Sequence, residues 1–193
     1  MPLSLAKMPR ETKICILELG MNKPGEILKL AKIANPDISI ITNVGNAHIA
    51  NFRSEREIAK EKSQILNFLN QRSFAIIPKD SKYFSMLNKK ALKNTKNVFS
   101  FGYNKSANFK IIQDSKKKSK TSFLIRNKKI SFPKNTTNIW QINVSIILCL
   151  LKILKIDHLR IKKKIEHLKS IKGRGLVHEI KIKGKKITLI DES

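Results

Sequence analysis

Residues 38–48 read Ile38-Ser39-Ile40-Ile41-Thr42-Asn43-Val44-Gly45-Asn46-Ala47-His48, an apolar run followed by a polar loop. The run has the composition of a buried strand. After the loop, Ser54 and Glu57 have the spacing of a capping box, which predicts a helix that reaches about Asn70. A buried strand followed by a helix is the repeating unit of a parallel α/β sheet, so this stretch sets the expected fold class.

Apolar runs and amphipathic segments alternate through roughly the first hundred residues. Expected strands cover 14–19, 38–42, 74–77 and 97–101, and expected helices cover 24–34, 54–70 and 81–93. An antiparallel meander is expected over 108–132, then helices at about 139–156 and 158–169, and closing strands at 177–183 and 186–190. The sequence therefore predicts an α/β fold with a mostly parallel sheet flanked by helices and a small antiparallel patch.

Polar residues follow two of the expected strands. Glu18 closes the strand at 14–19, and Thr42, Asn43 and His48 follow the next one. Ligands of open α/β sheets bind beyond the carboxyl ends of strands. Taken singly, Glu18 could pair with a nearby lysine, and His48 could be a helix cap or a core residue. Together with Lys62 on the following helix, they could hold a metal–phosphate site.

Three segments carry a resemblance to the central ATPase domain of the Mur ligase family: Ile14 to Ile27, the Thr-Asn-x-Gly-x-Ala-His loop and Ala59-Lys60-Glu61-Lys62. The resemblance is strongest over 14–62 and 171–193 and weak over 80–135. Gly20-Met21-Asn22-x-Pro24-Gly25-Glu26 favours the branch that joins D-Ala-D-Ala to UDP-N-acetylmuramoyl-tripeptide over folylpolyglutamate or cyanophycin synthetases. This branch implies ATP-dependent phosphorylation of a carboxylate, followed by attack of the amine of D-Ala-D-Ala on the acyl-phosphate.

The resemblance also implies roles for the polar residues. Glu18 would bind Mg²⁺, for which a carboxylate oxygen is a suitable ligand, and His48 would bind a second Mg²⁺. Lys62 would react with CO₂ to give a carbamate that bridges metal, with Lys60 as the competing assignment. That reaction needs a neutral amine, so burial or nearby metal charge would have to lower the pKa of the lysine.

Further nucleotide-binding residues follow from the resemblance, in addition to Thr42 and Asn43. Asn143 would lie near the adenine, although the family segment begins with histidine where this chain has Ile139. Arg174, in a Gly-Arg-Gly turn, would face the phosphates as a fork of donors. Asp191 opens a segment that resembles the family's ribose-contacting motif.

Part of the family pattern has no match in these residues. The P-loop, Gly-x-x-Gly-Lys-Thr-Thr, whose backbone amides cradle phosphates, is not found. The opening Pro2-Leu3-Ser4-Leu5-Ala6-x-Met8-Pro9 resembles a segment downstream of that loop. We therefore expect a fragment, with 1–172 as a central domain lacking its P-loop and 173–193 as the start of a C-terminal ligase domain, and we expect no turnover by the fragment alone.

The chain carries 40 basic and 14 acidic residues, a formal net charge of +26. Such a charge is compatible with a non-catalytic basic domain that binds RNA or an anionic surface. However, the surplus is almost entirely lysine, spread over every segment, and resembles composition drift towards AT-rich codons. Aromatic residues that could stack on bases are not interleaved with the basic runs. We therefore predict no nucleic-acid partner and keep the basic binding domain as the alternative.

Cys15 and Cys149 lie in apolar runs, which predicts two reduced core thiols in a cytosolic protein. Their spacing does not suit a zinc site. No secretory signal is visible, and the longest apolar run, Ile146 to Leu151, is too short to span a membrane. We expect a cytoplasmic monomer without a membrane span.

Overall fold

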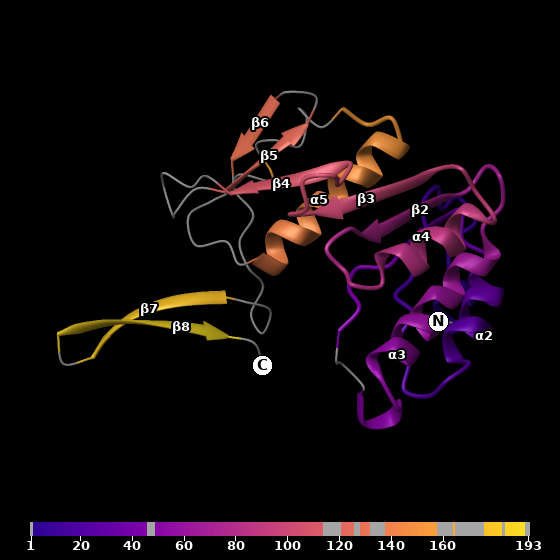
Figure 1. Cartoon of the computed structure of the whole chain (residues 1–193), viewed down its shortest axis with the longest axis horizontal. Helices are drawn as coiled ribbons and strands as arrows, with labels where there is room; N and C mark the ends of the chain where they lie inside the picture. Colours follow the sequence, from indigo (N-terminus) through magenta and orange to yellow (C-terminus); the bar gives the residue numbers. More distant parts are fainter. Residues whose placement is uncertain are drawn as a thin grey trace. The chain divides into compact units, whose positions relative to one another are not determined.

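The computed structural model describes residues 2–45, 49–113, 121–125, 128–131, 138–157, 164, 176–182 and 184–191 (Figure 1). The chain divides into two compact units, Met1–Ser100 and Phe101–Ser193.

The first unit alternates helices and strands. Its elements are α1 (Pro2–Ala6), α2 (Glu26–Ala34), β1 (Ile38–Ile40), η1 (Ile49–Asn51), α3 (Glu55–Lys62), η2 (Ser63–Phe68), β2 (Phe74–Pro78), α4 (Phe84–Leu92) and the start of β3 (Val98–Gly102). β1 and β2 pair in parallel, with Ile38 opposite Phe74. The expected parallel arrangement is confirmed, and the expected helix over 54–70 is present as α3 followed directly by the 3₁₀-helix η2.

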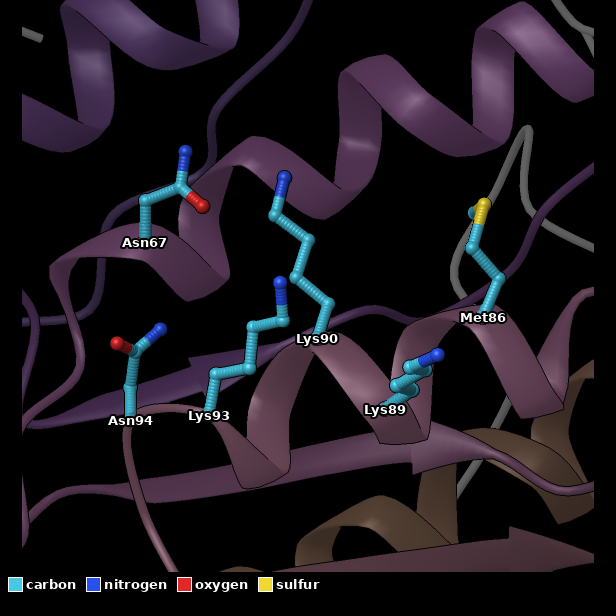
Figure 2. Close-up of a pocket in the computed structure, with 6 residues that line it drawn as sticks. All are labelled: Asn67, Met86, Lys89, Lys90, Lys93 and Asn94. Atoms are coloured by element: carbon cyan, nitrogen blue, oxygen red, sulfur yellow. The ribbon is translucent and has the colours of Figure 1, made fainter.

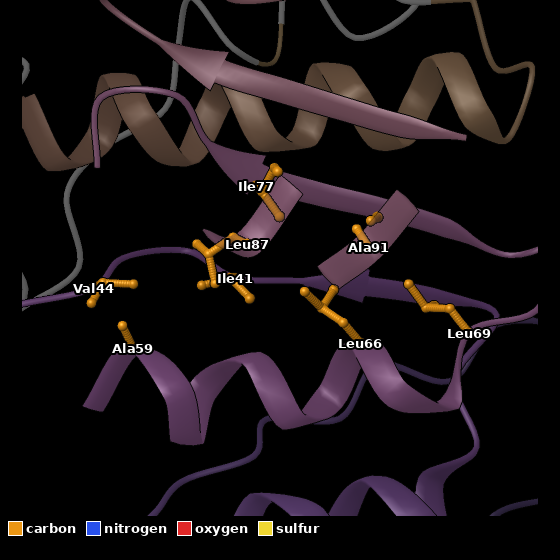
Figure 3. Close-up of a cluster of buried hydrophobic side chains, with 9 residues drawn as sticks. Ile41, Val44, Ala59, Leu66, Leu69, Ile77, Leu87 and Ala91 are labelled. Atoms are coloured by element: carbon orange, nitrogen blue, oxygen red, sulfur yellow. The ribbon is translucent and has the colours of Figure 1, made fainter. Parts of the chain in front are cut away.

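The core of the first unit lies between the strands and the helices α3, η2 and α4. Figure 3 shows its buried side chains, which are Ile41, Val44, Ala59, Leu66, Leu69, Ala75, Ile77, Leu87 and Ala91. Three successive residues of β2, Ala75 to Ile77, are fully buried. Since side chains alternate between the faces of a strand, β2 is covered on both faces, as expected in a parallel sheet. A second cluster (Met21, Ile27, Phe52 and Ile58) joins α2 to α3.

The expected strand at 14–19 is not formed. Residues 14–20 have no regular secondary structure, and Ile16 is 86% exposed. Leu19 and Met21 reach the core, where both pack in the cluster that joins α2 to α3. A strand needs a neighbour for its backbone N–H and C=O groups, and no strand of the described residues pairs with this segment. The predicted strand at 14–19 is therefore wrong, and Glu18 does not lie at the end of a strand.

The second unit contains two sheets and a long helix. The end of β3 pairs in parallel with β4 (Phe109–Gln113). β5 (Thr121–Ile125) pairs antiparallel with β4 and with β6 (Lys128–Ser131). β7 (Leu176–Ile182) and β8 (Lys185–Asp191) form a separate antiparallel pair. The expected meander and the two closing strands are confirmed, whereas the expected helix over 158–169 lies outside the described residues except at 164.

The helix α5 (Asn138–Ile153) supplies much of the second core. Its buried residues include Val144, Leu148 and Cys149, and burial raises the pKa of the Cys149 thiol well above its usual range. Cys15, in contrast, is exposed, so the prediction of two core thiols holds for one of them. None of the helices in the described part of the chain combines the length and hydropathy that crossing a bilayer requires.

Candidate functional site

Asn43 and Lys62 meet in the folded chain. The Nζ of Lys62 donates a hydrogen bond to the backbone carbonyl oxygen of Asn43, 19 positions earlier, over 2.8 Å. Lys62 ends α3, and Asn43 lies in the loop that follows β1. The contact therefore joins the helix to the loop at the carboxyl end of a strand, where ligands of α/β sheets bind.

The surroundings of Lys62 suit chemistry at its amine. Burial lowers the pKa of the Lys62 ammonium, because a charged group loses hydration in the protein interior. The acceptor at Asn43 is a neutral carbonyl, which offsets this loss less than a carboxylate would. Lys60, two positions earlier on the same helix, is exposed. Of the two lysines, only Lys62 is partly buried.

The start of α3 fixes the position of Lys62 along the helix. The Ser54 hydroxyl accepts from the N–H of Glu57 at 3.3 Å, as the capping box predicts. The carboxylate of Glu57 accepts from the N–H of Arg53 at 2.9 Å, one residue before the position expected in an ideal capping box. Acidic residues in the first turn and basic residues in the last turn also match the helix dipole.

The remaining candidates of the first unit lie on exposed segments. Thr42 and Asn43 are exposed, and buried Ile41 and Val44 anchor the loop that carries them. Glu18 is exposed, and among the described residues no hydrogen bond or ion pair joins it to Asn43 or Lys62. His48 lies outside the described residues, so the predicted pairing of Glu18 with His48 remains a prediction.

The loop before α2 carries part of the family resemblance. Hydrogen bonds between its own residues hold it in a turn. The Glu26 carboxylate accepts from the N–H groups of Asn22 at 2.6 Å and Lys23 at 3.0 Å. These two hydrogen bonds lower the pKa of Glu26. Gly25 has a φ of +88°, a left-handed conformation that glycine adopts without strain. The segment therefore forms a defined turn between Glu18 and α2.

Three candidates belong to the second unit. Asn143 is exposed on α5, whereas the nearby Gln141 is buried and accepts from the Tyr103 hydroxyl at 2.7 Å. Asp191 is the last residue of β8, opposite Leu176, and its side chain is not described. Arg174 lies outside the described residues.

Sequence reasoning missed two charged residues, Glu61, which precedes Lys62 in the chain, and Lys90, which contacts the two residues that follow Lys62. Glu61 is 6% exposed, and its Oε1 accepts from the N–H of Ile27 at 2.9 Å. The Nζ of Lys90 donates to Ser63 Oγ at 3.1 Å and to Gln64 Oε1 at 3.2 Å, and burial lowers its pKa. Glu61 lies three positions after buried Ile58 and so on the same helix face, a spacing that could have identified it.

A pocket of about 390 Å³ opens between η2 and α4 and is lined by Asn67, Met86, Lys89, Lys90, Lys93 and Asn94. Figure 2 shows Lys90 and Lys93 extending from the end of α4 towards η2, which carries Asn67. The Lys90 amine is already bound to Ser63 and Gln64, and Lys89 and Lys93 are exposed. The pocket is thus an open basic depression that contains none of the predicted site residues.

A complete metal site is not formed by the described side chains. Within them, no group of three or more histidine, cysteine, aspartate or glutamate side chains could hold a metal ion. Glu18 offers one oxygen donor, and a carbamate on Lys62 would offer others. These hard oxygen ligands fit Mg²⁺.

Comparison with known proteins identifies relatives. A family model described as the Mur ligase middle domain matches residues 1–147. The chain is 37% identical over 112 residues to a UDP-N-acetylmuramoyl-tripeptide–D-alanyl-D-alanine ligase from Rickettsia prowazekii, covering 57% of the chain and 25% of that protein. It is 40% identical over 98 residues to a ligase of the same name from Buchnera aphidicola subsp. Acyrthosiphon pisum, covering 51% of the chain and 21% of that protein.

Solved structures share the fold. MurF from Acinetobacter baumannii matches with a TM-score of 0.81 at 22% identity, covering 100% of this chain and 41% of that one. MurF ligase from Thermotoga maritima, in complex with ADP, matches with a TM-score of 0.79 at 23% identity. The match covers 100% of this chain and 43% of that one. The matched segments span about a quarter or less of the two sequence relatives.

Proposed function

Since the chain belongs to the Mur ligase family, we propose that it is part of an ATP-dependent ligase that joins D-Ala-D-Ala to UDP-N-acetylmuramoyl-tripeptide through an acyl-phosphate. Two relatives that match by sequence carry the name of that ligase. Such an enzyme would be a cytoplasmic monomer that makes a peptidoglycan precursor, and it would thereby serve cell shape and cell division.

We propose that residues 1–172 form the middle, nucleotide-binding domain and that residues 173–193 begin the next domain. The family match over 1–147 supports the first assignment. The β7–β8 pair, a sheet of its own, supports the second. Asn143, Arg174 and Asp191 would contribute to nucleotide binding in this arrangement, together with Thr42 and Asn43.

The contact between Lys62 and Asn43 carries the mechanistic proposal. The neutral Lys62 amine attacks CO₂, a C–N bond forms, and a proton passes to water, which leaves an anionic carbamate. Burial of the amine, which lowers its pKa, increases the neutral fraction available for this step. The Asn43 carbonyl accepts from the amine and holds it at the carboxyl end of β1.

Glu18, His48 and the carbamate of Lys62 would together hold Mg²⁺. The bound metal would neutralise charge on the phosphoryl group during its transfer. The residues of this chain supply the oxygen and nitrogen ligands and orient them.

The proposal is tested by the reaction of the whole ligase that contains this chain. With ATP, Mg²⁺ and both substrates, one UDP-N-acetylmuramoyl-pentapeptide should form for each ADP released. Without D-Ala-D-Ala, steady-state release of ADP should stop. Equal turnover with glutamate in place of the dipeptide would contradict the assignment and favour a folylpolyglutamate-type synthetase.

We further propose that the excess of basic over acidic residues does not bind nucleic acid. The lysines that line the basic depression between η2 and α4 come from one helix and its end, and the Lys90 amine already donates to Ser63 and Gln64. Sequence-blind RNA binding that weakens steeply with salt would contradict this proposal.

A further inference from the structure

We infer that the basic depression between η2 and α4 is a binding site for a small molecule that carries phosphate groups. The depression is built within the first unit, Met1–Ser100. None of the residues proposed for nucleotide or metal binding is among the six that line it. A site here is therefore additional to the proposed ligase function and independent of it.

The size and lining of the depression suit a small polar ligand. Its volume of about 390 Å³ lies within the range of roughly 300–1,000 Å³ that is typical of small-molecule sites. Met86 supplies an apolar part of the lining, and the other lining residues are all lysine or asparagine. Such a lining offers many hydrogen-bond donors and little apolar surface, so it favours an anion over an apolar ligand.

No carboxylate balances the lysines inside the depression. None of the six lining residues is acidic. Across the described part of the chain, no hydrogen bond or ion pair holds the amine of Lys89 or Lys93. Glu61 is close enough to Lys90 to favour its protonated form, but its carboxylate is buried and accepts from the N–H of Ile27. An anion in the depression would therefore meet amines and no competing carboxylate of the lining.

The Lys90 amine is already oriented towards η2. It donates to Ser63 Oγ at 3.1 Å and to Gln64 Oε1 at 3.2 Å. An ammonium group has three N–H donors, so one remains for a ligand. Figure 2 shows Lys93 extending from α4 in the same direction. The nearby charge of Lys93 disfavours the charged form of Lys90 in addition to the effect of burial, and an anion bound at both amines would offset that repulsion.

The two asparagines of the depression are held in place as well. Asn67 Nδ2 donates to Gln64 Oε1 at 2.7 Å, and Asn94 Nδ2 donates to the Leu66 carbonyl oxygen at 2.9 Å. Each amide group has a second N–H. Side chains that are ordered before a ligand arrives lose less conformational freedom on binding.

The spacing of the amines favours phosphate over carboxylate. Lys90 and Lys93 lie three positions apart on α4 and so on one face of the helix. A phosphate group carries about 1.5–2 negative charges and three acceptor oxygens on one centre. A single phosphate group can therefore accept from several amines at once, whereas a carboxylate brings one charge and two oxygens.

The helix dipole offers a simpler reason for lysines at this end of α4. Lys89 and Lys90 lie in its last turn, where cations are stabilised. The dipole does not explain why the Lys90 amine bonds to two residues of η2, or why two asparagines lie beside it. The depression therefore contains more than a charged helix end requires.

Equilibrium dialysis of the 193-residue chain against radiolabelled inorganic pyrophosphate tests the site. Mg²⁺ is left out, and the ionic strength is kept low because salt screens exposed charges. One pyrophosphate should bind per chain and saturate. Lys93→Gln should weaken binding about tenfold or more, the value of one charge-assisted hydrogen bond, and Lys90→Gln should weaken it at least as much.

The matched control is Lys96→Gln. It removes an exposed lysine three positions after Lys93 that does not line the depression, so it should leave the affinity unchanged. Equal losses in Lys93→Gln and Lys96→Gln would overturn the inference, because they would show diffuse attraction to a basic surface. If Lys90→Gln does not fold, Lys93→Gln and Lys89→Gln decide the question, since both alter exposed side chains.

Three further results would overturn the inference. The first is the absence of saturable binding to the wild-type chain. The second is a loss of affinity in Arg174→Gln but not in Lys93→Gln, which would place pyrophosphate with the residues proposed to bind the nucleotide. The third is displacement of pyrophosphate by acetate at the same concentration, or by a short single-stranded oligonucleotide at the same phosphate concentration. Acetate would indicate a site for any small anion, and the oligonucleotide would indicate a nucleic-acid surface.

Discussion

Lys62 at the end of α3 and Asn43 after β1 are joined by a hydrogen bond of 2.8 Å from the lysine amine to the backbone carbonyl. This bond places an amine with a lowered pKa at the edge of the sheet where α/β proteins bind their ligands. Since the acceptor belongs to the backbone, a substitution of the Asn43 side chain leaves it in place. Lys62 is therefore the side chain on which the function of this contact depends.

In the whole ligase, Lys62→Ala should abolish turnover, because no other side chain in the contact can form the carbamate. Stability should change by no more than about 1 kcal/mol, the typical net value of one hydrogen bond. Turnover and urea unfolding measure the two effects, and Lys60→Ala, which alters an exposed lysine of the same helix, is the matched control. Partial rescue of Lys62→Ala by a short carboxylic acid would support the need for an anion at this position. Normal activity of the variant would contradict the carbamate role of Lys62.

The pH dependence of stability should reveal the depressed pKa of Lys62. Its folded-state pKa lies below the ordinary lysine value, so the unfolded chain binds more protons in the window between the two values. Stability should therefore rise with pH through that window. Lys62→Met lacks this contribution, so its stability relative to the wild type should decline from pH 7 to pH 10. Urea unfolding of both proteins at each pH measures the difference, which should stay constant if the amine ionises as it does in water.

Gly25→Ala should destabilise the first unit. Gly25 has a φ of +88°, and an added Cβ would meet nothing within 4 Å, so the cost is one of backbone conformation. For a non-glycine residue in the left-handed region that cost is about 1–2 kcal/mol. Gly20→Ala is the control, because it also has open space but no positive φ. Equal unfolding midpoints in urea for the two variants would show that the turn before α2 is not held in this conformation.

The 193-residue chain should bind ATP–Mg²⁺ very weakly or not at all. A P-loop supplies several backbone amide donors and a lysine, and none of the sequence matches its pattern. Losing three charge-assisted hydrogen bonds, at about 1.5–3 kcal/mol each, removes most of the roughly 8 kcal/mol that a micromolar site needs. Calorimetric titration decides this, and micromolar affinity would mean that other residues hold the phosphates.

Local sequence patterns were sufficient to predict those helices and strands whose stabilising interactions lie within one segment. The Ser54–Glu57 spacing predicted the start of α3, and the hydroxyl accepts from the expected N–H. The apolar run at 74–77 predicted β2, which is buried on both faces. Helical periodicity likewise predicted α2, α4 and α5. In each case, the capping group or the apolar stripe lies within the element itself.

Whether a segment pairs as a strand, and whether a side chain is buried, depended on residues far away in the sequence. The run at 14–19 resembles a strand, yet Ile16 is 86% exposed, because an apolar run becomes a strand only beside a partner that accepts its hydrogen bonds. Glu61 stands between two lysines in the sequence, and only the fold brings the N–H of Ile27 to its buried carboxylate.

The sequence by itself determined the fold class, the positions of most helices and strands, and the small set of polar residues from which a site could be built. The tertiary structure decided which of two lysines is partly buried, since Lys60 and Lys62 differ by two positions on one helix and only Lys62 is shielded from solvent. It also decided that Asn43 meets Lys62. Solvation and distance are properties of packing between segments, and no local pattern of residues specifies them.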